Sequence, residues 1–348
     1  MIQRLLRGRA FYLVFGALVI FLYVRTVSFR SAEPLEMPSM NETTSAPEWW
    51  TESLGTQELT QAAQRAGPLG AAALLLAALF LGLAAGGVVI ALRGFATGRF
   101  RSVWRFPSTA QPPWSFRELG RILFLILAVA LLIPFVRFAL LAAQPTWSLD
   151  AHLWITVSML ILDTMAVLII LAFAEGKGRP AWRVFGCSRH AAWCSIKTGL
   201  LGYVTIFPWL LVLFFLVVEA ARRLGYQPPL EPIHRLLFEE HRAPVLALTA
   251  LLACAIGPVA EEFFFRGVVY ATIRRRVSRV LAMAISGALF ALIHTNVVGF
   301  LPILLLGGLL AYLYERTGSL IAPIAVHVLH NTLLLSLAMV FRQLVPFG

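Results

Sequence analysis

Residues 257–267 read GPVAEEFFFRG, and they lie inside an apolar run that is long enough to cross a membrane. Within this stretch Glu261, Glu262 and Arg266 place three charged groups in six positions. A charged side chain near the centre of a bilayer costs about 2.5–3.5 kcal/mol on insertion scales, so these groups should not face lipid. The stretch therefore predicts a polar cavity, or charged partners, inside a bundle of membrane-spanning helices.

The composition around this stretch is typical of a membrane protein. Of 348 residues, 59% are hydrophobic and 13% are charged, and the mean hydropathy is +0.81. Soluble proteins carry about a quarter charged residues. The net charge of +12 comes from cations in short linkers, and no basic polar domain with interleaved aromatic residues is available to bind nucleic acid. The three cysteines match neither a disulfide framework nor a zinc-ribbon spacing.

Apolar runs recur along the whole chain, and most approach the ~20 residues that a spanning helix needs. They cover residues 10–24, 68–92, 122–142, 153–174, 198–219, 244–272, 280–296, 299–314 and 319–341. The run at 299–314 is shorter, so we expect it to be tilted or partly re-entrant. The predicted fold class is all-α, a polytopic transmembrane helix bundle of about eight or nine spans.

The charges between the runs predict the topology. Linkers 93–121, 175–197 and 274–279 are rich in arginine, which places them in the cytoplasm by the positive-inside rule. We expect a cytoplasmic N-terminus, with the first run acting as an uncleaved anchor rather than a removed signal peptide. The polar segment 26–66 should lie outside the cytoplasm. The side of the C-terminus stays open, because a re-entrant 299–314 would reverse it.

Two further charges, Arg137 and Asp163, fall within apolar runs on two early helices. Intramembrane charges usually pair with one another or mark a functional site. We expect these two to form an ion pair that holds their helices together, in preference to a catalytic role.

The spacing of the first motif separates the two glutamates. Glu262 and Arg266 are four residues apart, so they are neighbours on one helical face, where the guanidinium can hold a carboxylate ionised. Glu261 points about 100° away and is free to act on another group. Two carboxylates in a low-dielectric site favour different protonation states, which suits a general base or acid.

Two later helices carry polar residues that match this motif. Phe290 and His294 share one helical face, and His327 and Asn331 share another. His330 is the less certain member, because it could face another helix. Each residue alone could be an interhelical hydrogen bond, the usual role of a lone polar residue in a membrane helix.

Their depth in the bilayer argues for a joint site. Glu262, His294 and His327 lie between 11 and 15 residues from the nearest basic flank. At 1.5 Å per residue they sit about 16–23 Å from that flank. Unrelated polar residues would have no reason to agree in depth.

These three motifs together resemble those of the CPBP intramembrane proteases. That family includes the type II CaaX prenyl endopeptidases (Rce1-like) and bacterial relatives linked to bacteriocin immunity (the Abi family). The resemblance divides the chain into a catalytic domain at 243–341 and an N-terminal membrane region at 1–242, with about five spans and no assigned role. It is specific as a set of motifs and weak for any one of them.

The resemblance implies a helical bundle with a cavity open to the cytosol, and it suggests roles for the residues. Glu261 would activate water, helped by His294, and Arg266 would orient the glutamates. Oxyanion stabilisation would fall to His327 and Asn331. Glu262 is the less certain partner in this scheme.

The resemblance leaves the cofactor open between zinc and none. Glu261, His294 and His327 could form a three-ligand zinc site with an open position for water. The same groups could instead work as a glutamate base with hydrogen-bond donors. No HExxH pair is present, and we lean towards the metal-free mechanism.

The predicted function is an intramembrane endopeptidase acting on a membrane-associated peptide or protein, CaaX-like or other. One alternative is a catalytically silent scaffold or immunity protein, but that would be expected to lose a motif residue. A transporter is the other, but it would be expected to show inverted repeats. The only lysines are Lys177 and Lys197, and this arginine-rich composition suggests a GC-rich genome. We expect an integral protein of a bacterial cytoplasmic (inner) membrane. In addition to the substrate, we expect the lipid bilayer as a partner and no nucleic acid.

Overall fold

A computed structural model describes residues 6, 8–30, 67–98, 106, 114–143, 150–178, 180–226, 236–237, 239–294 and 297–344. Within those residues every regular element is a helix, so the all-α prediction is confirmed. The first half contains α2 (Arg9–Arg30), α4 (Pro68–Ala96), α6 (Phe116–Ala143), α7 (Ala151–Glu175), α8 (Ala181–Val184) and α9 (Arg189–Arg223). The second half contains α11 (Ala243–Leu251), η2 (Leu252–Ile256), α12 (Gly257–Glu262), η3 (Phe263–Tyr270), α13 (Ala271–Arg274), α14 (Arg279–Ile293), α15 (Val297–Thr317) and α16 (Ile321–Leu344). Most of the polar segment 26–66 lies outside the described residues.

The predicted apolar runs all form helices. Seven helices in the described part of the chain are long and apolar enough to cross a membrane, and two shorter apolar helices lie at Ala10–Leu22 and Arg279–Ile293. The expectation of a short element at 299–314 needs correction, because α15 is a continuous helix of 21 residues. The short element is instead α14, whose 15 residues extend about 22 Å.

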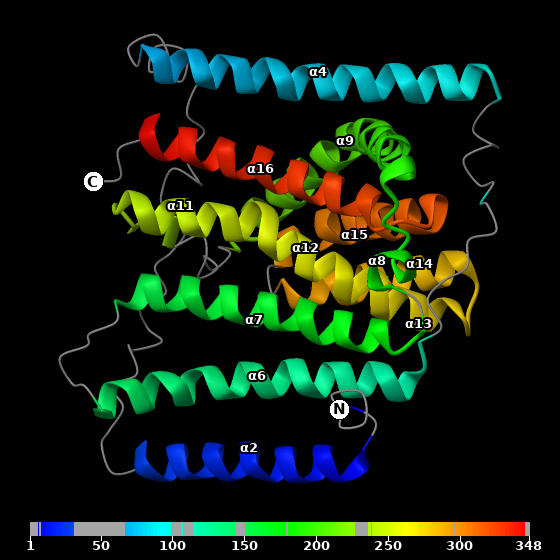
Figure 1. Ribbon diagram of the computed structural model, residues 1–348. Helices are drawn as coiled ribbons and strands as arrows, with labels where there is room; N and C mark the ends of the chain where they lie inside the picture. The colour runs from blue at the N-terminus through cyan, green and yellow to red at the C-terminus, as the bar shows by residue number, and fades with distance from the viewer. Residues whose placement is uncertain are drawn as a thin grey trace.

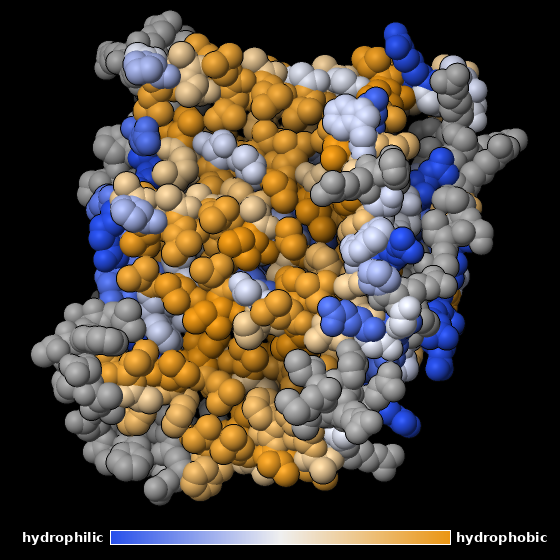
Figure 2. Space-filling model, viewed as in Figure 1, coloured by the Kyte–Doolittle hydropathy of each residue, from blue (hydrophilic) through white to orange (hydrophobic). Residues whose placement is uncertain are grey.

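Several of the apolar helices lie side by side in one layer. Figure 1 shows α2, α6, α7 and the continuous helix from α11 to α13 in succession, followed by α16 and α4. Helix α9 packs against α4, α15 and α16, so it joins the N-terminal region to the last two helices. Contacts therefore cross the predicted boundary at residue 242, and the division into two domains stays a prediction. A broad apolar band covers the middle of the molecule in Figure 2, with hydrophilic residues at both ends of the helices.

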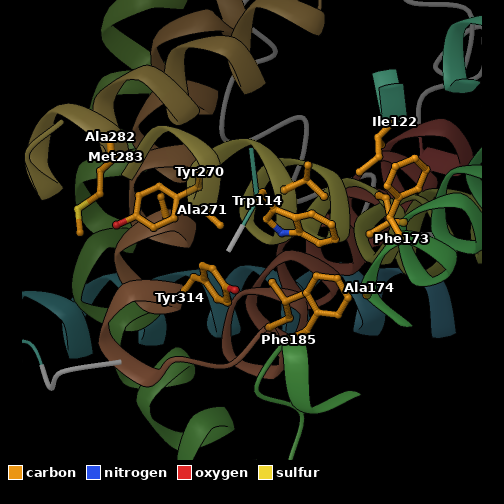
Figure 3. Packing of buried hydrophobic residues seen from close by; sticks show 14 of the residues in the cluster. Trp114, Ile122, Phe173, Ala174, Phe185, Tyr270, Ala271, Ala282, Met283 and Tyr314 are labelled. Atoms are coloured by element: carbon orange, nitrogen blue, oxygen red, sulfur yellow. The ribbon is translucent and has the colours of Figure 1, made fainter. Parts of the chain in front are cut away.

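Aromatic residues close one end of the bundle, which we call the basic end: the end where α7 and α13 finish and α14 and α16 begin. Trp114, Phe185 and Tyr314 are buried together there (Figure 3). The indole Nε1–H of Trp114 donates to the carbonyl of Gly267 at 2.6 Å. The Phe185 carbonyl accepts from the backbone N–H of Leu320 at 3.1 Å. Two linkers from the first half of the chain thus hold the helices of the second half.

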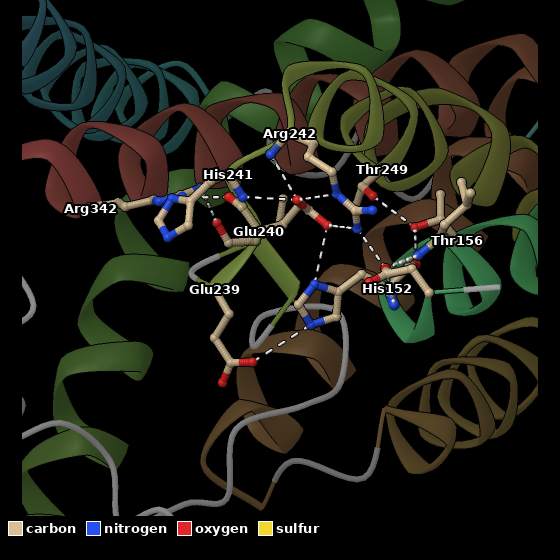
Figure 4. Close-up of polar contacts among 11 residues, drawn as sticks. His152, Thr156, Glu239, Glu240, His241, Arg242, Thr249 and Arg342 are labelled. Carbon is tan, nitrogen blue, oxygen red and sulfur yellow. Dashed lines mark hydrogen bonds and ion pairs between the residues drawn. The ribbon is translucent and has the colours of Figure 1, made fainter. Parts of the chain in front are cut away.

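A cluster of charged residues closes the other end (Figure 4). We call it the opposite-end cluster: Asp150, His152, Glu240, Arg242 and Arg342. Arg242 donates to Asp150 at 2.5 Å and to Glu240 at 2.6 Å, while His152 Nδ1 lies 3.2 Å from Glu240. Arg342 donates to the carbonyl of Glu240 at 2.5 Å. The cluster ties the starts of α7 and α11 to the end of α16, so α16 ends on the side where α11 begins.

Candidate active site

The two glutamates lie between two widened turns of one helix. Pro258 lacks an N–H, and its ring crowds the carbonyl four residues earlier, so a regular α-helical turn is disfavoured there. The chain responds with the π-helical segment η2 just before α12, and a second one, η3, follows Glu262. Such π-segments occur frequently at functional sites, because they redirect side chains and free backbone carbonyls.

Glu262 lies at the centre of a fully buried hydrogen-bonded group. Its Oε1 accepts from Arg266 Nη1 at 2.7 Å and from His327 Nδ1 at 2.9 Å. The side chains of Glu262 and Arg266 are 0% exposed, and that of His327 is 3% exposed. Arg266 Nη2 also donates to the carbonyl of Gly307 at 3.1 Å. The predicted pairing of Glu262 with Arg266 is therefore present, and it joins α12 and η3 to α15 and α16.

Not every polar atom of this group has a partner. Glu262 Oε2 and Arg266 Nε are buried and have no hydrogen-bond partner within the described residues. Buried polar atoms are nearly always paired, so exceptions call for an explanation such as a catalytic role or a bound water. The group therefore keeps hydrogen-bonding capacity deep within the bundle.

Glu261 differs from its neighbour in exposure. Its side chain is 31% exposed, and its Oε2 lies 3.6 Å from His327 Nε2. The carboxylate of Glu262 can only accept from His327 Nδ1, so Nδ1 carries a proton. In a neutral ring Nε2 then has a lone pair, and it becomes a second donor only when the imidazole is protonated. Glu261 thus faces a histidine whose orientation Glu262 fixes.

His294 shares an aromatic neighbour, the Phe290 ring, with this group. Helix α14 ends at Ile293, and His294 follows as its C-terminal cap. Its Nδ1 is 2.8 Å from the Phe290 carbonyl, which leaves Nε2 as the nitrogen able to accept a proton. The Phe290 ring lies between the two histidines, with centroid distances of 4.7 Å to His294 and 5.5 Å to His327. The Arg266 guanidinium carbon lies 4.5 Å from the same ring.

Asn331 and His330 point in different directions. Asn331 Nδ2 donates to the carbonyl of Ala253 in η2 at 2.9 Å. His330 Nδ1 lies 3.0 Å from the Tyr203 hydroxyl on α9. His330 therefore faces another helix, as the sequence analysis allowed. Asn331 therefore secures a widened turn of the glutamate helix, one helical turn beyond His327.

The three predicted zinc ligands do not have the mutual spacing of metal ligands in this structure. In the part of the chain that the structure describes, the one group with the mutual spacing of metal ligands is Asp150, His152 and Glu240. Both of its carboxylates already accept from Arg242. Glu261, His294 and His327 do not share such spacing, so we derive no step through a metal.

The predicted ion pair between Arg137 and Asp163 is wrong. Arg137 lies over the ring of Trp154 at 5.7 Å. Asp163 instead lies beside α12, where a Cβ atom at Gly257 would be 3.6 Å from its Oδ2. Depth could have found this residue, because Asp163 lies 14 residues before Lys177, within the 11–15 residues that relate the other site residues to their basic flanks.

A comparison with known protein families finds a match in the second half of the chain. Residues 243–333 match a family model described as "Type II CAAX prenyl endopeptidase Rce1-like". The resemblance carried by the three motifs is thus confirmed for that part of the chain.

Three relatives are similar to part of this chain. "Putative membrane peptidase YdiL" of Bacillus subtilis (strain 168) is 28% identical over 85 residues, which is 24% of this chain and 35% of that protein. "Uncharacterized 24.3 kDa protein" of Escherichia coli is 29% identical over 133 residues, 36% of this chain and 61% of that protein. "Membrane-embedded CAAX protease MroQ" of Staphylococcus aureus (strain USA300) is 28% identical over 141 residues, 36% of this chain and 56% of that protein. The chain therefore spans less than two thirds of each relative, and no solved structure matches it.

Proposed function

We propose that the protein is an intramembrane endopeptidase that hydrolyses a peptide bond of a membrane-associated substrate. The observation that carries this proposal is the chain of contacts from Arg266 through Glu262 and His327 to Glu261, buried at one end and open at the other. Such an arrangement fixes the orientation of a histidine and leaves one carboxylate accessible. The match of residues 243–333 to the endopeptidase family model supports the same activity.

In the proposed mechanism Glu261 is the general base. It removes a proton from a water molecule while the water oxygen attacks the scissile carbonyl carbon, and it later returns that proton to the leaving amine. Accessibility selects Glu261 over Glu262, because both Glu262 and its partner Arg266 are 0% exposed. Proton transfer by a positioned carboxylate contributes about 10²–10⁴-fold to a rate.

Histidine side chains complete the proposed site. When the His327 ring is protonated, its Nε2–H can donate to the oxyanion of the tetrahedral intermediate. His294 presents Nε2 as a second proton acceptor for the attacking water, since its Nδ1 is held by the Phe290 carbonyl. Asn331 would reach the oxyanion only after releasing Ala253, so we propose that it supports the turn in this state and rearranges when substrate binds.

The membrane orientation follows from the charges. The protein is an integral membrane protein by its apolar helices. By the positive-inside rule we propose that the basic end and the N-terminus face the cytoplasm of a bacterial cell, and the opposite-end cluster faces outward. The site then lies within reach of the cytoplasmic leaflet. This position suits a peptide that is anchored there by a lipid or an apolar segment, as in CaaX-like substrates.

Cleavage of a fluorogenic prenylated CaaX peptide by purified protein in detergent tests the proposal. Glu261→Gln and His294→Gln should each lose activity, while Arg137→Gln, a matched change of an intramembrane charge outside the site, should keep it. Each assay is run with and without a zinc chelator, which decides the cofactor. Activity that survives Glu261→Gln would contradict the proposed mechanism. If the wild type cuts neither this peptide nor lipid-anchored membrane proteins, the endopeptidase proposal fails.

A further inference from the structure

Trp114 connects the first half of the chain to the helix that carries the glutamates. It lies just before α6, and it is buried at 1% exposure. Its indole Nε1–H donates to the carbonyl of Gly267 in η3 at 2.6 Å, and Gly267 directly follows Arg266 in the chain. The carbonyl of Trp114 accepts from Arg275 Nη1, just beyond the end of α13, at 2.9 Å. Trp114 therefore holds this helix from Arg266 to its basic end.

Phe185 holds the same segment from a second linker. Its ring is stacked on that of Trp114 with 6.4 Å between centroids, and it meets the ring of Phe263 edge-on at 4.9 Å. A Cβ atom at Gly267 would be 2.9 Å from Phe185 Cε1, so the absence of a side chain at this position allows the close approach. Phe263 precedes Arg266 and Gly267 follows it. Aromatic side chains from the first half of the chain thus contact η3 before and after its arginine.

Other contacts fix Trp114 and Phe185 in turn. Lys177 Nζ lies 4.8 Å from the centroid of the Trp114 ring, and the same ammonium group pairs with Glu118 on α6. The carbonyl of Phe185 accepts from the backbone N–H of Leu320 at the start of α16. A shift of η3 relative to α6 would therefore break the indole bond, because the indole is held from the other side.

The position of η3 determines where the Arg266 side chain lies. Its guanidinium donates to Glu262 and to the carbonyl of Gly307, and Glu262 also accepts from His327 Nδ1. Arg266 Nε is buried and has no hydrogen-bond partner among the described residues, so no bond at Nε opposes a rotation of the guanidinium. Displacement of a catalytic group by about 1 Å can lower a rate about 10²-fold. A small movement of the backbone at Gly267 should therefore reach the histidine through two hydrogen bonds.

We propose that Trp114 is a positioning residue for the active site. By holding the Gly267 carbonyl, its indole fixes the backbone that carries Arg266. Through Arg266 it then sets the orientation of Glu262 and His327. This gives the first half of the chain a role, which is to hold the glutamate helix in place from the basic end. The effect on cleavage rests on the proposed function, whereas the structural link between Trp114 and Glu262 does not.

A double-mutant cycle on thermal unfolding in detergent tests the structural link without any substrate. Trp114→Phe keeps an aromatic ring and removes the N–H, and Glu262→Gln removes the charge that Arg266 holds. The melting temperature of the double variant should fall by less than the sum of the two single falls, because residues in one hydrogen-bonded network do not act additively. Trp193→Phe, the same substitution at a 64% exposed position on α9, should be additive with Glu262→Gln. Additive falls for Trp114→Phe would overturn the link.

The kinetics of peptide cleavage, measured well below the melting temperatures, test the positioning role. Trp114→Phe should lower kcat about 10-fold and change KM less than about 2-fold, because the groups that act on the scissile bond are displaced. Phe173→Leu removes volume from the same aromatic cluster and no hydrogen bond, so its kcat should stay within about 2-fold of the wild type. An unchanged kcat in Trp114→Phe, or an equal loss in Phe173→Leu, would refute the role of the indole. Non-additive unfolding in a protein that cleaves nothing would instead refute the proposed function.

Discussion

Two clusters in this molecule contain the same kinds of residue but differ in their hydrogen bonds. The opposite-end cluster contains Asp150, Glu240, His152 and Arg242, with Arg342 joining it through the backbone. The site around the glutamate helix contains Glu261, Glu262, His327 and Arg266. Each therefore includes two acids, a histidine and an arginine, and the opposite-end cluster contains Arg342 in addition. At the opposite end Arg242 donates to both acids, whereas at the site Arg266 donates to Glu262.

The difference shows what separates a structural cluster from a candidate active site. Arg242 satisfies the opposite-end acids, and the pKa values of Asp150 and Glu240 are lowered by its hydrogen bonds. In the buried site Glu261 receives no hydrogen bond from Arg266 among the described contacts, and two buried polar atoms have no partner. Residue types alone would rank the clusters equally. The accessible acid that the arginine does not satisfy distinguishes the site.

Replacing each histidine in turn gives the largest expected contrast. His327→Gln should lower kcat by about 10²–10³-fold, the usual effect of removing one oxyanion donor. His152→Gln should change kcat less than about 2-fold, because its contacts lie at the other end of α7. Peptide cleavage by both variants, with folding checked by circular dichroism, measures the contrast. Equal losses of kcat would contradict the functional difference that the hydrogen bonds of the two clusters indicate.

Replacing each arginine compares their contributions to stability. Arg266→Met leaves Glu262 charged and buried without its partner, which should destabilise the fold by about 3–5 kcal/mol. The double change Glu262→Gln with Arg266→Met should recover part of this loss, since no buried charge remains. Arg242→Met should lower the melting temperature in detergent less than Arg266→Met, because Arg242 is about half exposed. An equal loss of stability for both arginine variants would contradict the expected effect of burial.

Asn331→Ala should have an intermediate effect. Loss of its bond to the Ala253 carbonyl should cost about 0.5–1.5 kcal/mol of stability, the typical net value of one hydrogen bond. Thr205→Val is a control, because its hydroxyl donates to the carbonyl of Leu201 one turn earlier on α9. If Asn331 also assists catalysis, kcat should fall well beyond the change in the control. Thermal unfolding and cleavage rates separate the two contributions.

Acid should loosen the opposite-end cluster, with the smallest effect expected. The folded-state pKa values of Asp150 and Glu240 are lowered, so their contribution to stability is complete above the unfolded values of about 3.9 and 4.3 and is lost as the pH falls below them. Hydrogen exchange at the start of α11 and the end of α16 should therefore stay slow at neutral pH and accelerate in strong acid. In Arg242→Met, exchange should already be faster at neutral pH, and acid should accelerate it less, because the folded-state pKa values move towards the unfolded ones. If hydrogen exchange at these positions does not change in acid, these hydrogen bonds contribute little to stability.

Much of the fold was predictable from the sequence, because a bilayer demands long apolar helices. Each apolar run became a helix, and the i,i+4 spacing of Glu262 and Arg266 predicted their pairing. The end of α15 was harder to predict, since Glu315 is buried inside the protein, whereas a charged residue at that position is typical of a linker.

Contacts between distant helices were harder to predict. His327 meets Glu262 across 65 positions, and Asn331 meets a carbonyl that a π-segment exposes. Neither helix period nor depth specifies which of several facing groups will bond. Asp163 was assigned to Arg137 because opposite charges were assumed to pair, whereas in the structure Asp163 lies against Gly257 on α12. The roles of all these residues in catalysis stay predictions.

The bond between Trp114 and Gly267 also bears on how the protein is made. Its two ends are 153 residues apart, a stretch that a ribosome adding 5–20 residues per second needs roughly 8–30 s to synthesise. During that interval the helices synthesised before Trp114 are already in the membrane, and the aromatic cluster around Trp114 is still incomplete. His327 follows Gly267, so the polar site is assembled only after the last helix is inserted. A nascent chain that stalls before α16 would therefore carry the glutamates without their histidine, and the order of synthesis would itself delay the proposed peptidase activity.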